Sequence, residues 1–408
     1  MLMLAFLPVF VNSYPLSCHS PSLSRPYPPL VRMRFIHTAD WQIGKPFKQF
    51  GERESVLKQA RLTVIARIAD LAKQQGAEHV LVAGDIYDAE APTPRTLLEP
   101  LERMRGASHV HWHLIPGNHD PHRPHGLWDR VLAHGLPPNV TAHLAPSPAP
   151  LGREAMLLPA PLTRKTENND LTTWMDSAET APGLLRIGLA HGSVTGFGSG
   201  GEAGNPIDPR RPQQAGLAYL ALGDWHRTMQ IGSALWYAGT PEPDRAGSQE
   251  TGQVLVVDIF GPGAQPTVTP HAVGSFRWLT RDEHLTDSEG IASMDARLRM
   301  LDDLPATILR LRLDGALSLA ARTQFDKTML SLSAALFHLD ADTTRLANRP
   351  TDDDLEAIDF GGVLHHAARR LRAMADDEAL TLAERHRASE ALVLLYTRVA
   401  DTRMPAGD

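Results

Sequence analysis

Short apolar runs alternate with longer amphipathic ones over the first half of the chain. The short runs predict buried strands at residues 34–39, 79–83, 110–114, 184–190 and 217–222. Between them, apolar residues at helical spacing predict a helix over about residues 52–75, and Thr93 followed by Pro94 predicts the start of a second helix that runs to about residue 105. Strands that alternate with crossover helices indicate an α/β fold with parallel strands.

The pattern changes after residue 222. Apolar runs at 235–238 and 253–259 leave no room for crossover helices, so we expect both strands to pair in antiparallel fashion. Beyond residue 271, a strand, an amphipathic helix near 291–301 and a strand over about 309–313 predict a small β-α-β unit. From residue 318 onward the pattern is almost wholly helical.

These patterns divide the chain into separate parts. Residues 1–32 combine an apolar start with a Ser/Pro-rich tract, and we interpret them as a disordered leader or a misassigned start, with Met33 opening the folded protein. A signal peptide is the alternative, but no Lys or Arg precedes the apolar run. The main domain is predicted over 33–270, a capping domain over 271–347 and a helical partner-binding region over 348–408.

Composition sets outer limits on function. The formal net charge of −7 excludes nucleic-acid binding by overall charge, so such binding would need local basic patches. The single cysteine, Cys18, excludes an intrachain disulfide, disfavours a thiolate zinc site and fits a reducing compartment, which we take to be the cytoplasm. No apolar stretch approaches membrane-spanning length, so we expect no membrane partner.

Polar residues of the kinds that bind metals follow each of the predicted parallel strands. They are Asp40 and Gln42, Asp85, Asn118 and His119, His191, and Asp224 and His226. Ligands in open α/β sheets bind at the carboxyl ends of the strands, so we expect these side chains to converge. An ordinary turn with exposed polar side chains would explain residues 116–120 alone, but the other strand ends favour a shared site.

The residue types favour hard divalent ions. Oxygen and imidazole donors without sulfur suit manganese or magnesium before zinc. A carboxylate such as Asp85 can bridge two ions about 3.5–4 Å apart, an arrangement that suits hydrolysis of a phosphate ester. The expected cofactors are therefore two divalent ions, with Mn2+ preferred and Mg2+ as the other candidate.

The ordered motifs resemble those of the calcineurin-like metallophosphoesterases. The motifs are Asp40, Gly84 with Asp85, residues 117–120, His191 with Gly192, and Asp224 with His226. The resemblance covers roughly residues 33–270. It implies a β-sandwich flanked by helices, with a small α+β cap and a helical C-terminal tail. Residues 37–40 and the predicted β-α-β unit further resemble the SbcD-type DNA repair exonucleases.

The resemblance also implies a role for each residue at the strand ends. The first ion would be held by Asp40, the residue at 42, Asp85 and His226. The second ion would be held by Asp85, Asn118, His191 and the residue at 224. His119 would lie beside the ions and position the phosphate or protonate the leaving oxygen.

Two positions depart from the family pattern. The family usually has histidine where this chain has Gln42 and Asp224. Both replacements supply oxygen donors, so they should move the metal preference further toward hard ions. The alternative interpretation is a weakened first metal site.

Basic residues near the same edge are candidates for substrate binding. We expect Lys45 and Arg123 to contact phosphate. The pair Arg210 and Arg211 falls in residues 193–216, a glycine- and proline-rich segment that predicts a mobile surface loop.

Histidines outside the motifs admit two interpretations. His109, His111 and His113 alternate along a predicted strand and could form a metal stripe, but a partly exposed strand face explains them better. His122 and His125 lie just after the motif at 117–120, where they either touch substrate or face solvent.

The leading hypothesis is a metal-dependent DNA exonuclease or endonuclease that acts in DNA repair with an SMC-like coiled-coil ATPase. Helices near 364–371 and 381–402 carry apolar faces that would pack on the chain's own cap or against that ATPase. The alternatives are a small-molecule phosphodiesterase or phosphatase, and a non-catalytic scaffold that binds DNA or a partner through a degraded metal site. The resemblance leaves a homodimer open.

Overall fold

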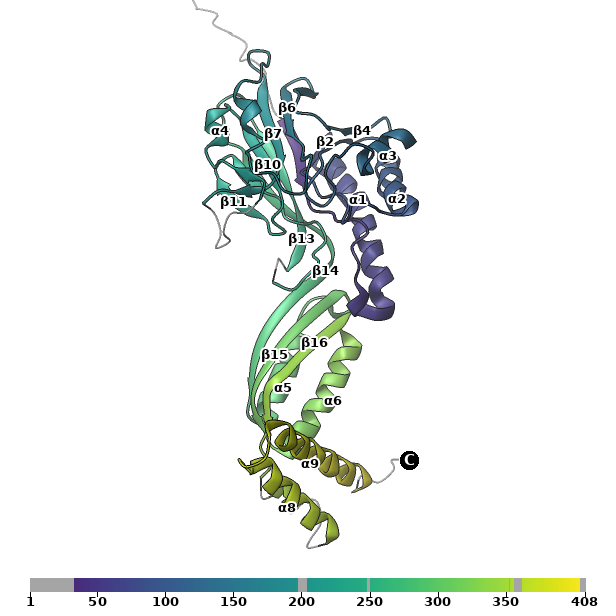
Figure 1. Ribbon diagram of the computed structural model, residues 1–408, viewed down its shortest axis with the longest axis vertical. Coiled ribbons are helices and arrows are strands. Elements are labelled where there is room, and N and C mark those ends of the chain that lie inside the picture. The colour runs from purple at the N-terminus through teal and green to yellow at the C-terminus, as the bar shows by residue number, and fades with distance from the viewer. Residues whose placement is uncertain (1–32, 197–203, 248–249, 352, 356–361, 404–408) are drawn as a thin grey trace, which may run out of the picture.

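The computed structural model describes residues 33–196, 204–247, 250–351, 353–355 and 362–403, so the predicted leader lies outside the described residues. Two sheets packed face to face, with helices on their outer sides, form one end of an elongated molecule (Figure 1). A long strand leads from this body to a smaller layer of strands and helices, and a pair of helices lies at the far end (Figure 1). This mixed α/β architecture is the fold class predicted from the sequence.

The larger sheet has the strand order β16-β15-β14-β13-β1-β2-β3-β4. Its strands are β1 Met33–Thr38, β2 His79–Val82, β3 His111–Leu114, β4 Val140–Ala142, β13 Thr251–Ile259, β14 Thr267–Leu285, β15 Thr307–Leu317 and β16 His338–Asn348. The strands β1 to β4 run parallel to one another, whereas β13 is antiparallel to β1. The carboxyl ends of β1, β2 and β3 therefore meet at one edge.

The smaller sheet has the order β11-β12-β10-β7-β6-β5. Its strands are β5 Ala149–Leu151, β6 Ala155–Ala160, β7 Leu185–His191, β10 Tyr219–Gly223, β11 Met229–Gly232 and β12 Leu235–Tyr237. The parallel strands β7 and β10 end side by side. A short ribbon of β8 Ser193–Val194 and β9 Pro206–Ile207 follows β7.

Helices connect the strands and cover the sheets. The α-helices are α1 Glu54–Gln75, α2 Pro94–Gly106, α3 Leu127–His134, α4 Arg211–Gln214, α5 Ser288–Arg299, α6 Leu319–Ala335, α8 Val363–Asp376 and α9 Leu382–Arg403. The 3-10 helices are η1 Lys48–Arg53, η2 Thr173–Asp176 and η3 Leu304–Ala306. The side chain of Thr93 accepts a hydrogen bond from the backbone N–H of Thr96, which confirms the predicted start of α2.

An apolar core lies between the two sheets. Phe35 of β1 and Leu81 of β2 are fully buried in one cluster with residues of the smaller sheet, among them Ile187 and Tyr219. The opposite face of β1 to β3 packs under α1 and α2, in a second cluster that contains Trp112. Because both faces of β1 to β3 are covered, the sequences of these strands are nearly continuous runs of apolar residues.

Two glycines allow close contacts between loops at the strand ends, one contact between the two sheets and one within the larger sheet. A Cβ on Gly223, the last residue of β10, would lie 2.0 Å from the carbonyl oxygen of Ala83, which follows β2. A Cβ on Gly117, after β3, would lie 2.2 Å from Oδ1 of Asp85. Only a residue without a side chain fits at these contacts. These two contacts determine how closely the loops after β2, β3 and β10 approach one another.

The structure corrects two predictions about strands. Residues 253–259 pair antiparallel with β1 as predicted, but β12 pairs with β10 in parallel, because β11 reverses the chain between them. The predicted helix beyond residue 318 is interrupted by β16, which pairs in parallel with β15. β16 is an edge strand with mostly polar side chains, so it lacks the apolar alternation that identifies a strand.

The segment 193–216 is also different from the prediction. Its described residues include β8, β9 and α4, and Arg211 is buried where a mobile loop was expected. The Arg211 guanidinium donates hydrogen bonds to Asp170 at 2.9 Å, Asp176 at 2.6 Å and Thr172 at 2.9 Å. Arg211 thus anchors the loop after β9 and is not free to contact substrate.

The C-terminal helices pack against the cap. The predicted β-α-β unit is present as β14, α5 and β15, and α6 and β16 extend it. Leu319 at the start of α6 shares a buried cluster with Ala368 of α8 and Leu392 of α9. Asp354 accepts hydrogen bonds from the backbone N–H groups of Leu319 at 3.0 Å and Ala320 at 3.1 Å. The helix pair therefore contributes to the fold of its own chain.

We predict that Gly223→Ala lowers the free energy of unfolding by about 1–3 kcal/mol, because the new methyl group must push the ends of β2 and β10 apart. Chemical denaturation measures the change. Gly106→Ala is the matched control: its Cβ would meet nothing within 4 Å, so we expect a change within about 0.5 kcal/mol. Equal stability of both variants would contradict the close approach of the two strand ends.

Candidate metal centre

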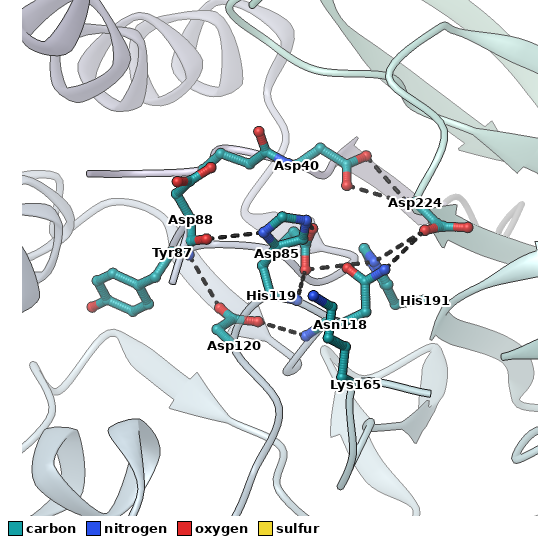
Figure 2. A network of polar contacts seen from close by, with 12 residues as sticks. Asp40, Asp85, Tyr87, Asp88, Asn118, His119, Asp120, Lys165, His191 and Asp224 are labelled. Carbon is teal, nitrogen blue, oxygen red and sulfur yellow. Dashed lines mark hydrogen bonds and ion pairs between the residues drawn. The ribbon is translucent and has the colours of Figure 1, made fainter. Parts of the chain in front are cut away.

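The candidate ligands lie in the loops that follow β1, β2, β3, β7 and β10. Figure 2 shows Asp40, Asp85, Asn118, His191 and Asp224 turned toward one another. In the described part of the chain, one group of such residues brings three ligand atoms within 4.8 Å of one another: Asp40, Asp85 and His191, all of them buried. The structure therefore brings together the side chains that the sequence places at separate strand ends.

The backbone turns sharply at these positions. Asp40 has a φ of 56°, Gln42 of 46°, Asp85 of 54° and Asp224 of 104°, all in the left-handed region that residues with a Cβ rarely adopt. Such conformations cost free energy and persist only where the surrounding structure holds them. The strain falls on the residues that would bind a metal, which is typical of a functional site.

Hydrogen bonds between neighbouring loops hold these turns. The backbone N–H of Gln42 donates to the carbonyl of Asp85 at 2.9 Å. Asp120, fully buried, accepts from the backbone N–H of Gly117 at 2.6 Å and of Tyr87 at 3.1 Å (Figure 2). Burial raises the pKa of Asp120 well above its usual value. Asp120 thus ties the loop after β2 to the loop after β3.

The residues expected to hold the second ion fit a divalent cation. His191 Nε2 and Asn118 Oδ1 are buried atoms without a hydrogen-bond partner. His191 Nε2 lies 3.6 Å from Asp85 Oδ1 and 3.8 Å from Asp224 Oδ1. His191 Nδ1 is hydrogen-bonded to the carbonyl of Ala83 at 2.8 Å, which directs the lone pair of neutral His191 to Nε2. Two buried acceptors without partners and two carboxylates therefore belong to one cluster, in which Asn118 Nδ2 donates to Asp224 Oδ1 at 3.4 Å.

The electrostatics of the cluster also favour a cation. Burial raises the pKa of Asp40 to about 7, although His226 and His191 act in the opposite direction. Burial disfavours charged His191, but the carboxylates of Asp85, Asp40 and Asp224 outweigh it and raise the pKa of His191 to about 9. The carboxylates thus draw positive charge into the site, and a divalent ion would satisfy the same demand.

The residues expected to hold the first ion are arranged differently. Gln42 Nε2 lies 3.1 Å from His226 Nε2, and Gln42 Oε1 accepts a hydrogen bond from Lys45 Nζ at 2.8 Å. His226 Nδ1 lies 3.2 Å from Asp244. Lys45, predicted to bind substrate, also lies 3.0 Å from Asp244 and 3.5 Å from Asp88. The potential ligand atoms of Gln42 and His226 are thus already engaged.

His119 lies beside the cluster. Its Nδ1 is hydrogen-bonded to the carbonyl of Asp88 at 2.9 Å, and its Nε2 is 4.0 Å from Asp85 Oδ2 (Figure 2). The side chain is 37% exposed, so it can reach a bound substrate. This position agrees with a proton-transfer role, which stays a prediction.

Other residues of the site were not found by sequence reasoning. Ser193 donates to Asp224 Oδ2 at 2.7 Å, and Asp244 supports both His226 and Lys45. Figure 2 shows Lys165, an exposed residue, with its ammonium directed toward Asn118. Only Asp244 had a sequence signal, its place at the end of a tight turn after β12. Nothing distinguishes Lys165 from other exposed lysines in the sequence.

Arg123, also predicted to bind substrate, is ion-paired within the protein. It forms an ion pair with Glu90 at 3.2 Å, and 47% of its side chain is exposed. His122 and His125 bond to Asp129 in the same turn: His122 Nε2 lies 3.3 Å from Oδ1, and the His125 backbone N–H donates to Oδ2 at 2.6 Å. These contacts hold the turn together.

The other histidines form no metal stripe in the described part of the chain. His113 is buried, with His79 at 3.1 Å on one ring nitrogen and His143 at 3.1 Å on the other. His111 is exposed, and His109 bonds separately to the carbonyl of Ala69 at 3.0 Å. We expected these histidines to lie on a partly exposed strand face. That prediction is wrong for His113, which is buried and has a second histidine beside each of its ring nitrogens.

Comparison with known proteins adds a family match. Residues 33–227 match the model of the family described as calcineurin-like phosphoesterase. The chain is 27% identical over 290 residues to the SbcD subunit of the SbcCD nuclease of Rhodobacter capsulatus, an alignment that covers 58% of this chain and 69% of the relative. Among solved structures, TT1561 of Thermus thermophilus matches 59% of this chain and 99% of its own with 11% identity and a TM-score of 0.37.

We predict that His191→Ala weakens Mn2+ binding more than about tenfold, because loss of a residue that merely supports a metal ligand already costs about 10–100-fold. Asp85→Asn should have a similar effect, because a neutral amide cannot balance a dication. His119→Ala should keep the metal and lose about a hundredfold or more in turnover if it acts as the general acid. Equilibrium dialysis against Mn2+ measures the binding. Equal metal loss in the His119 and His191 variants would contradict these roles.

Proposed function

We propose that this chain, whose residues 33–227 match the calcineurin-like phosphoesterase family model, is a metal-dependent phosphodiester hydrolase that cleaves DNA. The observation that carries the proposal is a pair of buried, unpartnered acceptors, His191 Nε2 and Asn118 Oδ1, together with the carboxylates of Asp85 and Asp224, which lie 3.6 and 3.8 Å from His191 Nε2. Such a set of donors suits a divalent ion, and hydrolysis of phosphate esters is the chemistry that hard divalent ions promote.

The residues of the site would have different roles in the proposed reaction. Asp85, Asn118, His191 and Asp224 would hold the ion, which supplies Lewis acidity and lowers the pKa of water. His119, exposed at the rim and fixed by the Asp88 carbonyl, would donate a proton to the leaving oxygen. Lys165, directed toward Asn118, would contact the scissile phosphate (Figure 2). We propose Mn2+ as the ion, with Mg2+ as the second candidate, because oxygen donors predominate.

DNA as the substrate, a role in DNA repair in the cytoplasm and an ATPase partner are proposed from the sequence resemblance to the SbcD-type DNA repair exonucleases. That protein is named as a nuclease subunit, and the similarity extends over 290 residues. None of the helices in the described residues is long and apolar enough to span a bilayer. A small-molecule phosphodiesterase with the same metal centre is the alternative, and a scaffold without activity is the third hypothesis.

The test compares DNA with a generic phosphodiester. We expect Mn2+-dependent cleavage of single-stranded, blunt or hairpin DNA, and slower cleavage of bis-p-nitrophenyl phosphate, with Mn2+ or Mg2+ supporting activity at least about tenfold better than Zn2+. Asp85→Asn is the inactive control. Cleavage of the small ester alone would indicate a small-molecule enzyme. No hydrolysis of any substrate with any metal would contradict the proposal, as would a preference for zinc.

The outer face of the helix pair is the proposed contact for an SMC-like coiled-coil ATPase. Val363 is 83% exposed, Leu382 81% and Leu394 63%, although the opposite sides of α8 and α9 are buried on α6. Apolar side chains exposed on helices are typical of helix-in-groove contacts. The partner would cover this face.

We predict that Leu394→Glu abolishes co-purification with the co-expressed ATPase and leaves thermal stability unchanged, because the side chain is outside the buried cluster. Met300→Glu, at a site that is 84% exposed on the cap, is the matched control and should keep the partner. Retention of the ATPase by the Leu394 variant would contradict the contact. Truncation after residue 350 is unsuitable, because it would uncover Leu319 and remove Asp354 from the start of α6.

A further inference from the structure

The first group of expected metal ligands, Asp40, Gln42, Asp85 and His226, does not fit a tightly bound ion. A metal would need the lone pairs of Gln42 Oε1 and His226 Nε2. Lys45 Nζ is a donor without acceptor capacity, so the amide oxygen of Gln42 must face it, at 2.8 Å. The amide nitrogen then faces His226 Nε2, at 3.1 Å, and donates to it. The lone pair of His226 Nε2 is therefore used within the protein, and the ammonium of Lys45 occupies one of the two on Gln42 Oε1.

Asp244 fixes this arrangement from the other side. It lies 3.2 Å from His226 Nδ1, which places the proton of neutral His226 on Nδ1 and leaves Nε2 as the acceptor for Gln42. It also lies 3.0 Å from Lys45 Nζ, whose side chain is only 25% exposed. Asp88 adds a second carboxylate at 3.5 Å. The ammonium of Lys45 is thus held against the first ligand group by three acceptors.

A second cation supports the same loop. Arg61 of α1 is buried, and its Nη1 donates to the carbonyl of Trp41, between the candidate ligands Asp40 and Gln42, at 2.8 Å. Two positive charges held inside the protein near one ligand group oppose a dication there, whereas the cation near the other group, Lys165, is an exposed side chain. The two halves of the centre therefore differ in charge as well as in free lone pairs.

We infer that Lys45 takes the place of the first ion, so that this chain binds one divalent cation tightly, between Asp85, Asn118, His191 and Asp224. The inference rests on the proposed function and revises the expected metal count from two to one. The Lys45 ammonium then offers a fixed positive charge to the phosphate on the side where a first ion would lie. Gln42 is the residue that positions it.

The test is the number of ions that the full chain binds. Purified protein, stripped with chelator and dialysed against micromolar Mn2+, is analysed by elemental mass spectrometry. We expect one ion for the wild type and two for the double variant Gln42→His/Lys45→Ala, which restores an imidazole and removes the ammonium. Lys48→Ala, an exposed lysine in the same segment, is the control and should bind one ion.

A wild-type count of two ions, or of none, overturns the inference. So does a count of one in a double variant whose thermal melting shows that it is folded. If the double variant does not fold, Lys45→Ala alone decides: its affinity for a second Mn2+ should rise at least tenfold over wild type, and an unchanged affinity overturns the inference. Hydrolysis of bis-p-nitrophenyl phosphate is measured separately, so loss of the proposed function would appear there and leave the ion count informative.

Discussion

Negative charge buried at the junction of two sheets is the constraint on which the rest of the structure depends. Asp40 and Asp85 lie where the strand ends of the larger sheet meet those of the smaller one, out of contact with water. Buried carboxylates are tolerated only when cations or hydrogen bonds compensate them. The tight glycine contacts and the left-handed turns bring that charge together, and the imidazole of His191 and the Lys45 ammonium partly balance it. The architecture is thus organised to hold positive charge at this point.

The compensation is unequal on the two sides of Asp85. Around His191, two potential ligand atoms, His191 Nε2 and Asn118 Oδ1, have no partner, and the hydrogen bond to the Ala83 carbonyl orients the imidazole without occupying Nε2. Around Gln42, the protein supplies the ammonium of Lys45 as its own cation. Internal hydrogen bonds occupy Gln42 Oε1 and His226 Nε2, the atoms that would bind a metal. Glutamine in place of the histidine usual in the family contributes to the difference, because the amide of Gln42 donates to His226 and accepts from Lys45 at the same time.

The sequence predicted the structure best at buried strands that end in a polar residue of the site. The strands that carry Asp40, Asp85 and His191 are covered on both sides, so they appear as apolar runs that end in a polar residue. The roles of Asp244 and Lys165 depend on side-chain direction across distant loops, which no local pattern encodes. β16 was missed because an edge strand needs little apolar alternation. The parallel pairing of β12 was missed because the short strand β11 was not recognised.

The most direct test of the account is an anomalous-scattering map at the manganese edge, from crystals of the full chain grown with Mn2+. The account predicts a single strong peak within coordination distance of His191 Nε2 and Asn118 Oδ1, and none between Gln42 and His226. A peak between Gln42 and His226, or no peak beside His191, would contradict it.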